Sequence, residues 1–156
     1  MRKTLVILGL AVGISSNAQA APTDVVFQGG VSITSTVNCP GWNPDKDLAW
    51  GTYWVPVAGS TNGPDSVITF HFPNGTAEGF ELGADVFTST FKPVTAYHVY
   101  TRVGKYAALA RVAQQVPATL STTTPTVTVR GAIKNWDRQA GCIVNFTLTG
   151  VRDLRP

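Results

Sequence analysis

The stretch CIVNFTLT at residues 142–149 alternates apolar and polar residues, and VSITSTVNC at residues 31–39 shows a similar alternation. This period of two predicts β-strands with one buried face, and each cysteine falls on the apolar face of its strand. A buried disulfide between Cys39 and Cys142 is therefore expected in an oxidising compartment. It would close a loop of about 100 residues, worth up to about 4.7 kcal/mol by the chain-entropy model. Because no Cys-x-x-Cys spacing occurs, we expect a structural crosslink and not a redox or metal site.

Residues 1–20 point to such a compartment. A positive start (Met-Arg-Lys) precedes an apolar run over residues 4–14, and Ala-Gln-Ala at residues 18–20 matches the small-x-small pattern of a cleavage site. We expect a secretory signal peptide at 1–20 with cleavage before Ala21, and a mature protein that is secreted or periplasmic, in a bacterium. The apolar run is shorter than the roughly 20 residues that a spanning helix needs, so no membrane insertion is expected after cleavage.

The rest of the chain also shows strand patterns, and charged residues are sparse at 13%. Gly29-Gly30 predicts a two-residue hairpin turn between two strands. With about eight or nine short strands, residues 21–156 are expected to form one all-β domain, a single antiparallel β-sandwich of the Ig-like or Greek-key type. The predicted strands cover residues 24–28, 31–38, 48–57, 67–72, 78–82, 86–91, 94–103, 126–135 and 142–151.

Residues 105–116 allow two interpretations. Their helical propensity and an apolar period near 3.6 predict one short helix ended by Pro117. A strand is the alternative, and we favour it because residues 94–103 would otherwise lack a partner in the sheet.

Charge is divided unequally between the two halves of the mature chain. Residues 21–91 contain seven acidic and one basic side chain (net −6), and residues 92–156 contain nine basic and two acidic ones (net +7). The two nearly cancel, so no nucleic-acid partner is expected. If the strands of the two halves interleave, the charges mix over one surface. Otherwise complementary faces would favour self-association or a protein partner.

Groups with catalytic potential are few. The chain has two histidines, His71 and His98, each inside an alternating strand and neither in a nucleophile-elbow pattern. His71 is expected to face solvent. Glu78 and Glu81 would point to opposite faces of one strand, so they do not form a catalytic pair. We therefore predict no catalytic residue and no cofactor.

One acidic loop resembles a metal site in part. Asn43, Asp45 and Asp47 alternate like the first ligands of a calcium loop, but the glycine and the closing glutamate of that loop are absent. Turn-forming Asn and Asp residues explain this segment, and we predict no metal site.

Aromatic residues gather just after this loop. On an extended strand Trp50 and Trp54 would share one side, about 13 Å apart. The rings could fill the core, with Tyr53 at its edge, or form a platform on which sugar rings stack. The candidate ligand-binding residues are Trp50, Tyr53, Trp54, Asp45 and Asp47.

These patterns predict a secreted, non-enzymatic protein that acts by binding or assembly, with a protein partner or a second copy of itself. A carbohydrate-binding module that uses the aromatic platform is the alternative, with a polysaccharide as ligand. A small hydrolase is the third hypothesis, and it would require His71 or His98 in a cleft beside an acid.

Overall fold

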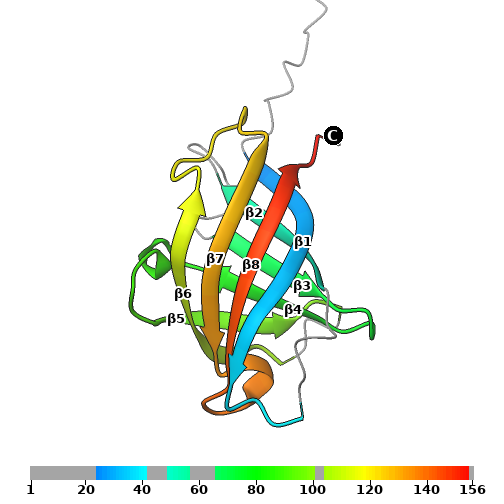
Figure 1. Cartoon of the computed structure of the whole chain (residues 1–156), viewed down its shortest axis with the longest axis vertical. Coiled ribbons are helices and arrows are strands. Elements are labelled where there is room, and N and C mark those ends of the chain that lie inside the picture. Colours follow the sequence, from blue (N-terminus) through cyan, green and yellow to red (C-terminus); the bar gives the residue numbers. More distant parts are fainter. Residues whose placement is uncertain (1–23, 42–48, 57–65, 101–103, 155–156) are drawn as a thin grey trace, which may run out of the picture.

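A computed structural model describes residues 24–41, 49–56, 66–100 and 104–154 (Figure 1). Eight antiparallel strands follow one another around a closed barrel, each paired with the next, and β8 pairs with β1. The elements are β1 (Asp24–Val37), β2 (Ala49–Pro56), β3 (Ser66–His71), β4 (Ala77–Leu82), β5 (Lys92–His98), β6 (Tyr106–Val116), β7 (Thr126–Lys134) and β8 (Ile143–Arg152), with the 3-10 helices η2 (Ala84–Val86) and η3 (Trp136–Arg138). The predicted signal peptide at 1–20 lies outside the described residues.

The all-β class is confirmed, but the predicted β-sandwich is wrong. The long strand β1 pairs with β2 on one side and with β8 on the other, and these pairings close the sheet. A sandwich and a barrel of this size both alternate inward apolar and outward polar residues. The alternation therefore could not distinguish them, because the order in which the strands pair and the closing β1–β8 pairing separate the two architectures.

Gly29 and Gly30 do not turn the chain, and the predicted hairpin there is wrong. Both lie within β1, where Gly29 is opposite Gly51 of β2 and Gly150 of β8. A Cβ atom on Gly29 would lie 2.0 Å from the carbonyl oxygen of Thr149, so no side chain fits. Glycines at such positions let a sheet bend sharply. This row of glycines gives the barrel wall the curvature that closure requires.

The segment with two interpretations is a strand. β6 covers Tyr106–Val116, so the strand prediction is confirmed and the short helix is wrong. Its buried residues, Ala108, Ala110 and Val112, recur every second position and face the interior. Alanine is also a strong helix former, and the composition of residues 105–116 therefore fits a helix as well as a strand.

The strand predicted at residues 86–91 is absent. Val86 ends η2 and is fully buried, whereas residues 87–90 bend without pairing to a neighbouring strand. The Thr88 hydroxyl donates to the carbonyl oxygen of Thr90 at 3.0 Å. Local side-chain bonds of this kind compete with a sheet ladder.

Side chains fill the interior of the barrel. Phe27, Tyr53, Phe70 and Phe80 are among its largest fully buried residues. Trp136 of η3 closes one end, with its ring centroid 5.4 Å from that of Phe70 and 5.2 Å from that of Phe80. Space for a ligand is therefore to be sought at the barrel end and not along its axis.

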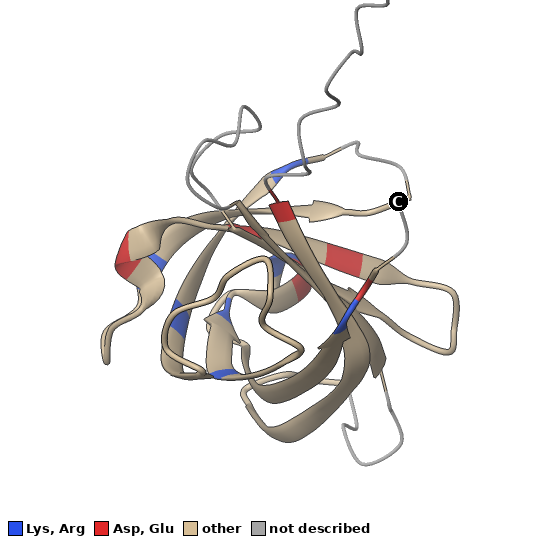
Figure 2. Ribbon diagram, turned by 90° about the horizontal axis from the view of Figure 1, so that it is seen from above, with Lys and Arg blue, Asp and Glu red and all other residues tan. Residues whose placement is uncertain are grey.

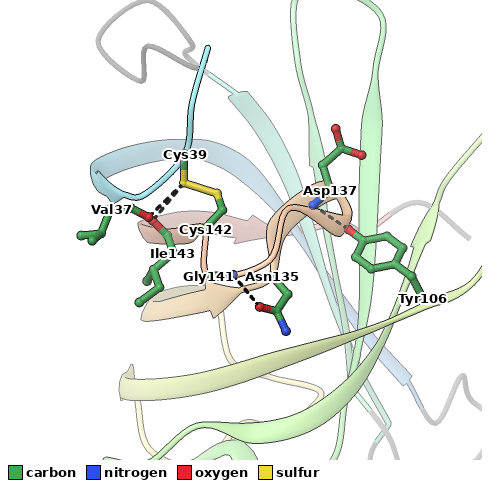
Figure 3. Close-up of a disulfide and its surroundings, with 8 residues drawn as sticks. All are labelled: Val37, Cys39, Tyr106, Asn135, Asp137, Gly141, Cys142 and Ile143. Carbon is green, nitrogen blue, oxygen red and sulfur yellow. Dashed lines mark hydrogen bonds between the residues drawn. A yellow bond between two sulfur atoms is a disulfide. The ribbon is translucent and has the colours of Figure 1, made fainter.

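The predicted disulfide between Cys39 and Cys142 is confirmed (Figure 3). The strand-face argument behind it holds only in part. A register shift between Ile33 and Ser35 reverses the alternation of β1, and Val37 is consequently 47% exposed. Asn38 then adopts a left-handed conformation (φ 55°), where the chain leaves the strand toward Cys142.

The strands of the acidic and basic halves do not interleave. β1–β4 are consecutive around the barrel, and β5–β8 complete it. Figure 2 views the barrel along its axis and marks the acidic and basic positions on the ribbon. Within the described part of the chain, two ion pairs join the halves where β4 meets the basic half: Lys105 lies 2.8 Å from Glu81, and His98 lies 2.6 Å from Glu78.

Among the described residues, no helix has the length and apolar character needed to cross a membrane.

Candidate functional site

A pocket of about 250 Å³ opens at the end of the barrel that carries the disulfide. The bond between Cys39 and Cys142 joins two of its walls, the segment after β1 and the loop before β8. The amide of Gly141 donates to the side-chain oxygen of Asn135 at 3.0 Å, which closes that loop on itself. The pocket is lined by Pro40, Gly41, Phe72, Asn74, Thr76, Glu78, His98, Trp136, Asp137 and Gln139.

Three neighbouring strands bring polar side chains to this end of the interior. Glu78 shares its face of β4 with the buried Phe80, and His98 shares its face of β5 with the buried Ala96. Glu78 pairs with His98 in the sheet register, and Ala96 pairs with Tyr106 of β6. At the pocket end of the barrel, the outermost inward-facing positions of β4, β5 and β6 are thus occupied by Glu78, His98 and Tyr106.

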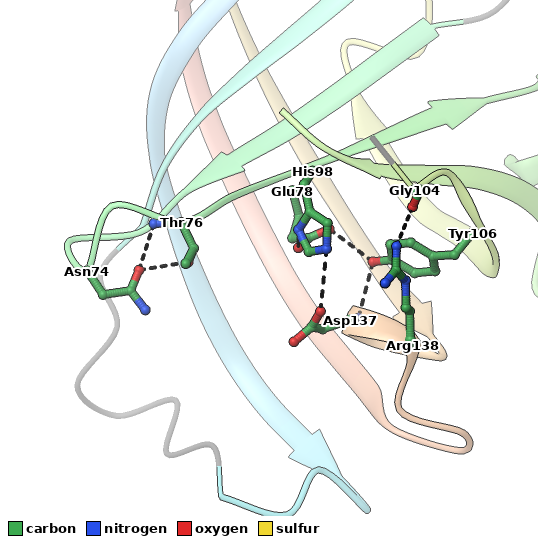
Figure 4. Close-up of polar contacts among 8 residues, drawn as sticks. All are labelled: Asn74, Thr76, Glu78, His98, Gly104, Tyr106, Asp137 and Arg138. Atoms are coloured by element: carbon green, nitrogen blue, oxygen red, sulfur yellow. Dashed lines mark hydrogen bonds and ion pairs between the residues drawn. The ribbon is translucent and has the colours of Figure 1, made fainter. Parts of the chain in front are cut away.

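These side chains form one hydrogen-bond network (Figure 4). Nδ1 of His98 lies 2.6 Å from Oε1 of Glu78, and the Tyr106 hydroxyl donates to Oε2 of Glu78 at 3.0 Å. The backbone amide of Asp137 donates to the Tyr106 oxygen at 3.1 Å. The Asp137 backbone is left-handed (φ 46°), a costly conformation for a residue other than glycine. The network therefore ties η3 to the strand ends.

Burial governs the acid–base behaviour of the network. The Glu78 side chain is 5% exposed. Burial raises the pKa of its carboxyl group, and the hydrogen bond from Tyr106 and the neighbouring His98 lower it in part. Burial and the adjacent Glu78 carboxylate raise the pKa of the Tyr106 hydroxyl. Tyr106 therefore remains a hydrogen-bond donor throughout the physiological pH range.

Two side chains that line the pocket carry acceptor oxygens. The Asp137 side chain is 51% exposed, and the side-chain oxygen Oε1 of Gln139 is buried without a hydrogen-bond partner among the described residues. A buried acceptor left in this state costs about 1–3 kcal/mol. The rings of Phe72 and Trp136 supply apolar surface beside these acceptors. This combination suits a small ligand that brings hydrogen-bond donors.

The predicted aromatic platform divides between the two sides of the barrel wall. Trp50 is 45% exposed on the outside and Trp54 is partly buried on the same side, whereas Tyr53 is fully buried inside. The Tyr53 hydroxyl donates to Oε1 of Gln115 at 2.9 Å. Trp50 and Trp54 share one side of β2, as expected, but this is the outer side. The ring that fills the core is that of Tyr53, which had been expected at the edge of the core. Asp45 and Asp47 lie outside the described residues, and ligand binding by these residues stays a prediction.

Two further rings extend the outer aromatic surface. His71 packs against Trp50 with centroids 5.0 Å apart, and Tyr100 lies 6.1 Å from the His71 centroid. Partial burial lowers the pKa of His71, which favours its neutral form. We refer to Trp50, His71 and Tyr100 as the outer aromatic row.

The sequence analysis named Glu78 and His98 but did not bring them together in one pocket, although a signal for Glu78 was present. Glu78 and Glu81 do lie on opposite faces as expected, but Glu78 falls on the apolar face together with Phe80. A charged residue at an inward position near a strand end indicates a barrel mouth. Asp137 and Gln139 carried no such signal, because Asp137 lies in the short 3-10 helix η3 and Gln139 follows it, outside any strand alternation.

The hydrolase hypothesis required a histidine in a cleft beside an acid, and His98 meets that condition. Glu78 holds Nδ1 of His98 and leaves Nε2 free, which is also how a carboxylate orients a catalytic histidine. Among the described residues that line the pocket there is no serine or cysteine to act as a nucleophile beside it. The hydrolase hypothesis stays a prediction.

A comparison with protein-family models, curated proteins and solved structures finds no match for this chain.

Proposed function

We propose that this chain is an exported, non-enzymatic binding protein whose barrel-end pocket holds a small ligand rich in hydrogen-bond donors. The observation behind this proposal is the Asp137 carboxylate, a charged acceptor that is 51% exposed and lines the pocket beside the rings of Phe72 and Trp136. Gln139, whose side chain also carries an amide oxygen, lines the same pocket. A ligand with hydroxyl, ammonium or coordinated-water groups supplies the donors that these atoms lack.

The architecture supports this location. Barrels of eight strands are either filled by side chains or hold one small ligand, and ligand sites in barrels gather at the mouths. The interior of this barrel is packed around Tyr53 and Phe70, which leaves the end as the accessible position. Because a shared architecture does not by itself imply a shared function, the proposal depends on the residues of the pocket.

Export is part of the same proposal. The leader-like residues 1–20 and the disulfide both fit a secreted or periplasmic protein. Disulfides persist in such compartments and are rare in a reducing cytosol.

Ligand binding can be tested with the mature protein and a panel of small polyols, sugars and diamines. Trp136 in the pocket wall provides a fluorescence signal, and calorimetry provides the stoichiometry. We expect one ligand per chain, with affinity reduced at least tenfold in Gln139→Ala and Asp137→Asn. Asp85→Asn serves as the control, because Asp85 is an exposed acid of η2 at the opposite end of the barrel. Equal affinity in all three variants would contradict a ligand in this pocket.

A carbohydrate-binding surface is the second candidate, and the outer aromatic row favours it. Trp50 is 45% and Tyr100 is 68% exposed, with the His71 ring between them. Exposed aromatic faces of this kind bind sugar rings by stacking. Trp50→Ala should abolish polysaccharide binding and leave pocket binding intact, whereas Gln139→Ala should do the reverse.

Self-association or a protein partner is the third proposal. It is supported by the separation of the acidic and basic halves around the barrel, which allows complementary faces.

A further inference from the structure

We propose that the barrel-end pocket binds a divalent transition-metal ion of the zinc type, held by Nε2 of His98 and the carboxylate of Asp137. Glu78 acts behind His98 as its orienting partner. This inference rests on the proposed function, since it names a hydrated metal ion as the donor-rich ligand of the same pocket.

The contact with Glu78 prepares His98 as a metal ligand. Oε1 of Glu78 lies 2.6 Å from Nδ1 of His98, and a carboxylate at that distance accepts the Nδ1 proton. In the neutral ring the other nitrogen, Nε2, then carries a free lone pair. A histidine held by a carboxylate on one nitrogen and by a metal on the other is the common arrangement in metalloproteins.

The free nitrogen faces a second ligand across a gap. Nε2 of His98 lies 3.9 Å from Oδ1 of Asp137, which is too long for a hydrogen bond. With metal–ligand bonds of about 2.0–2.2 Å, two ligands of a tetrahedral zinc ion lie about 3.4 Å apart. A small rotation of the Asp137 side chain, which is 51% exposed, closes that difference.

The pocket accommodates the remaining ligands. His98 and Asp137 both line its 250 Å³ of space, so water molecules complete the coordination of the ion. Metal-bound water donates hydrogen bonds, and the polar side chains of Asn74, Thr76 and Gln139 line the same pocket. The nearest acids, Glu78 and Asp137, give the site a negative charge that favours a cation. One imidazole with carboxylate and water oxygens suits zinc and similar ions.

A purely structural cluster is the competing explanation. A protonated His98 between Glu78 and Asp137 would satisfy the same distances without a metal. The two explanations differ in their response to added zinc. Only the metal site binds one zinc ion per chain and, on binding, changes the NMR signal of Nε2 of His98.

The test titrates zinc chloride into chelator-treated mature protein, with calorimetry and imidazole ¹⁵N NMR as readouts. We expect one zinc per chain and a shift of the Nε2 signal of His98. His71, the other histidine, lies on the outer side of β3 and is an internal reference whose signal should not move. Asp137→Asn should weaken binding at least tenfold, and Glu78→Gln by about 10–100-fold, as for other orienting partners. Asp85→Asn should bind zinc like the unmodified protein.

An absence of one-to-one binding, an unmoved His98 signal, or unchanged affinity in Asp137→Asn would overturn the metal site. Asp137 is exposed, so its variant is expected to fold even if Glu78→Gln does not. If the chelated protein binds polyols or diamines but not zinc, the metal site fails and the proposed pocket function stands. If it binds neither, both proposals fail.

Discussion

Glu78 and His98 face each other inside the barrel wall, with 2.6 Å between Oε1 and Nδ1. Among the described residues, Glu78 is the one acidic residue that is buried, with the residue as a whole 4% exposed. A buried charge needs a full set of partners, and Tyr106 supplies the second one. The network therefore stabilises the fold as well as shaping the pocket.

Removing one partner of this carboxylate should destabilise the protein. Tyr106→Phe deletes the hydroxyl that donates to Glu78, and hydrogen bonds to buried charged groups are worth about 1.5–3 kcal/mol. We expect the free energy of unfolding in urea to fall by that amount. Lys105→Ala is the control, because its ion pair with Glu81 is exposed and such pairs contribute less than about 1 kcal/mol. Equal losses in the two variants would contradict a structural role for the network.

The two neighbouring glycines of β1 should respond in opposite ways to alanine. In Gly29→Ala the new Cβ would lie 2.0 Å from the Thr149 carbonyl oxygen, so we expect a loss of about 3 kcal/mol or more. At Gly30 no atom lies within 4 Å of the new Cβ. Gly30→Ala should leave stability unchanged or raise it by about 0.5 kcal/mol, because the unfolded chain loses freedom. Thermal and urea unfolding of the two variants give the comparison.

Stability should decline at alkaline pH through Tyr53. Burial raises the pKa of Tyr53 to about 12 from the ordinary value of 10.0. The folded state thus favours the neutral ring, and its contribution is complete below pH 10 and lost as the pH rises through 12. A shift of about two units corresponds to about 2.7 kcal/mol, of which about half should be lost by pH 11.

Tyr53→Phe isolates this contribution. It removes the bond to Gln115 and should cost about 1 kcal/mol at pH 8. Between pH 8 and pH 11 its urea midpoint should fall less than that of the unmodified protein. Parallel pH profiles would show that another group is responsible.

Reduction of the disulfide should lower stability strongly. Cys39 and Cys142 are 103 positions apart, and a loop of that length corresponds to up to about 4.7 kcal/mol. We expect Cys39→Ser/Cys142→Ser to lose about 3–5 kcal/mol in urea unfolding. Addition of a reductant should destabilise the unmodified protein to the same extent and leave the double variant unaffected.

Self-association through complementary charge predicts a salt-dependent size. Sedimentation velocity of the mature protein at low and high salt should show dimers or larger species that dissociate as salt screens the charges. A monomer that is indifferent to salt would eliminate this proposal and leave the two ligand surfaces as candidates.

Local patterns predicted most strands of this fold, but not the way in which they close. Residues 126–135 and 142–151 were expected as strands and form β7 and β8 with shifts of one residue. The pairing of β8 with β1 joins positions at the two ends of the chain, and no local pattern specifies it. Gly29-Gly30 misled in a similar way, because a glycine pair marks a turn or a sharply bent strand alike.

The candidate site depends even more on long-range structure. The inward positions of Glu78 and His98 follow from strand alternation, so their place could have been inferred once a barrel was assumed. Asp137 lies in η3, in the connection between β7 and β8, where Asn135, Asp137 and Arg138 all have positive φ angles. Such a loop path depends on its contacts with Tyr106 and Gly104, which come from elsewhere in the sequence.

The seam between β1 and β8 bears on how quickly the chain folds. Every other strand pairs with its neighbour in sequence, so seven of the eight pairings in the barrel can form by short-range closure. Only the pairing of β1 with β8 requires segments that are distant in sequence to meet, and long-range pairing of this kind slows folding. Because the disulfide spans the same two strand ends, an oxidised chain starts with the seam already held together. Refolding from urea should therefore be faster for the oxidised chain than for the reduced one.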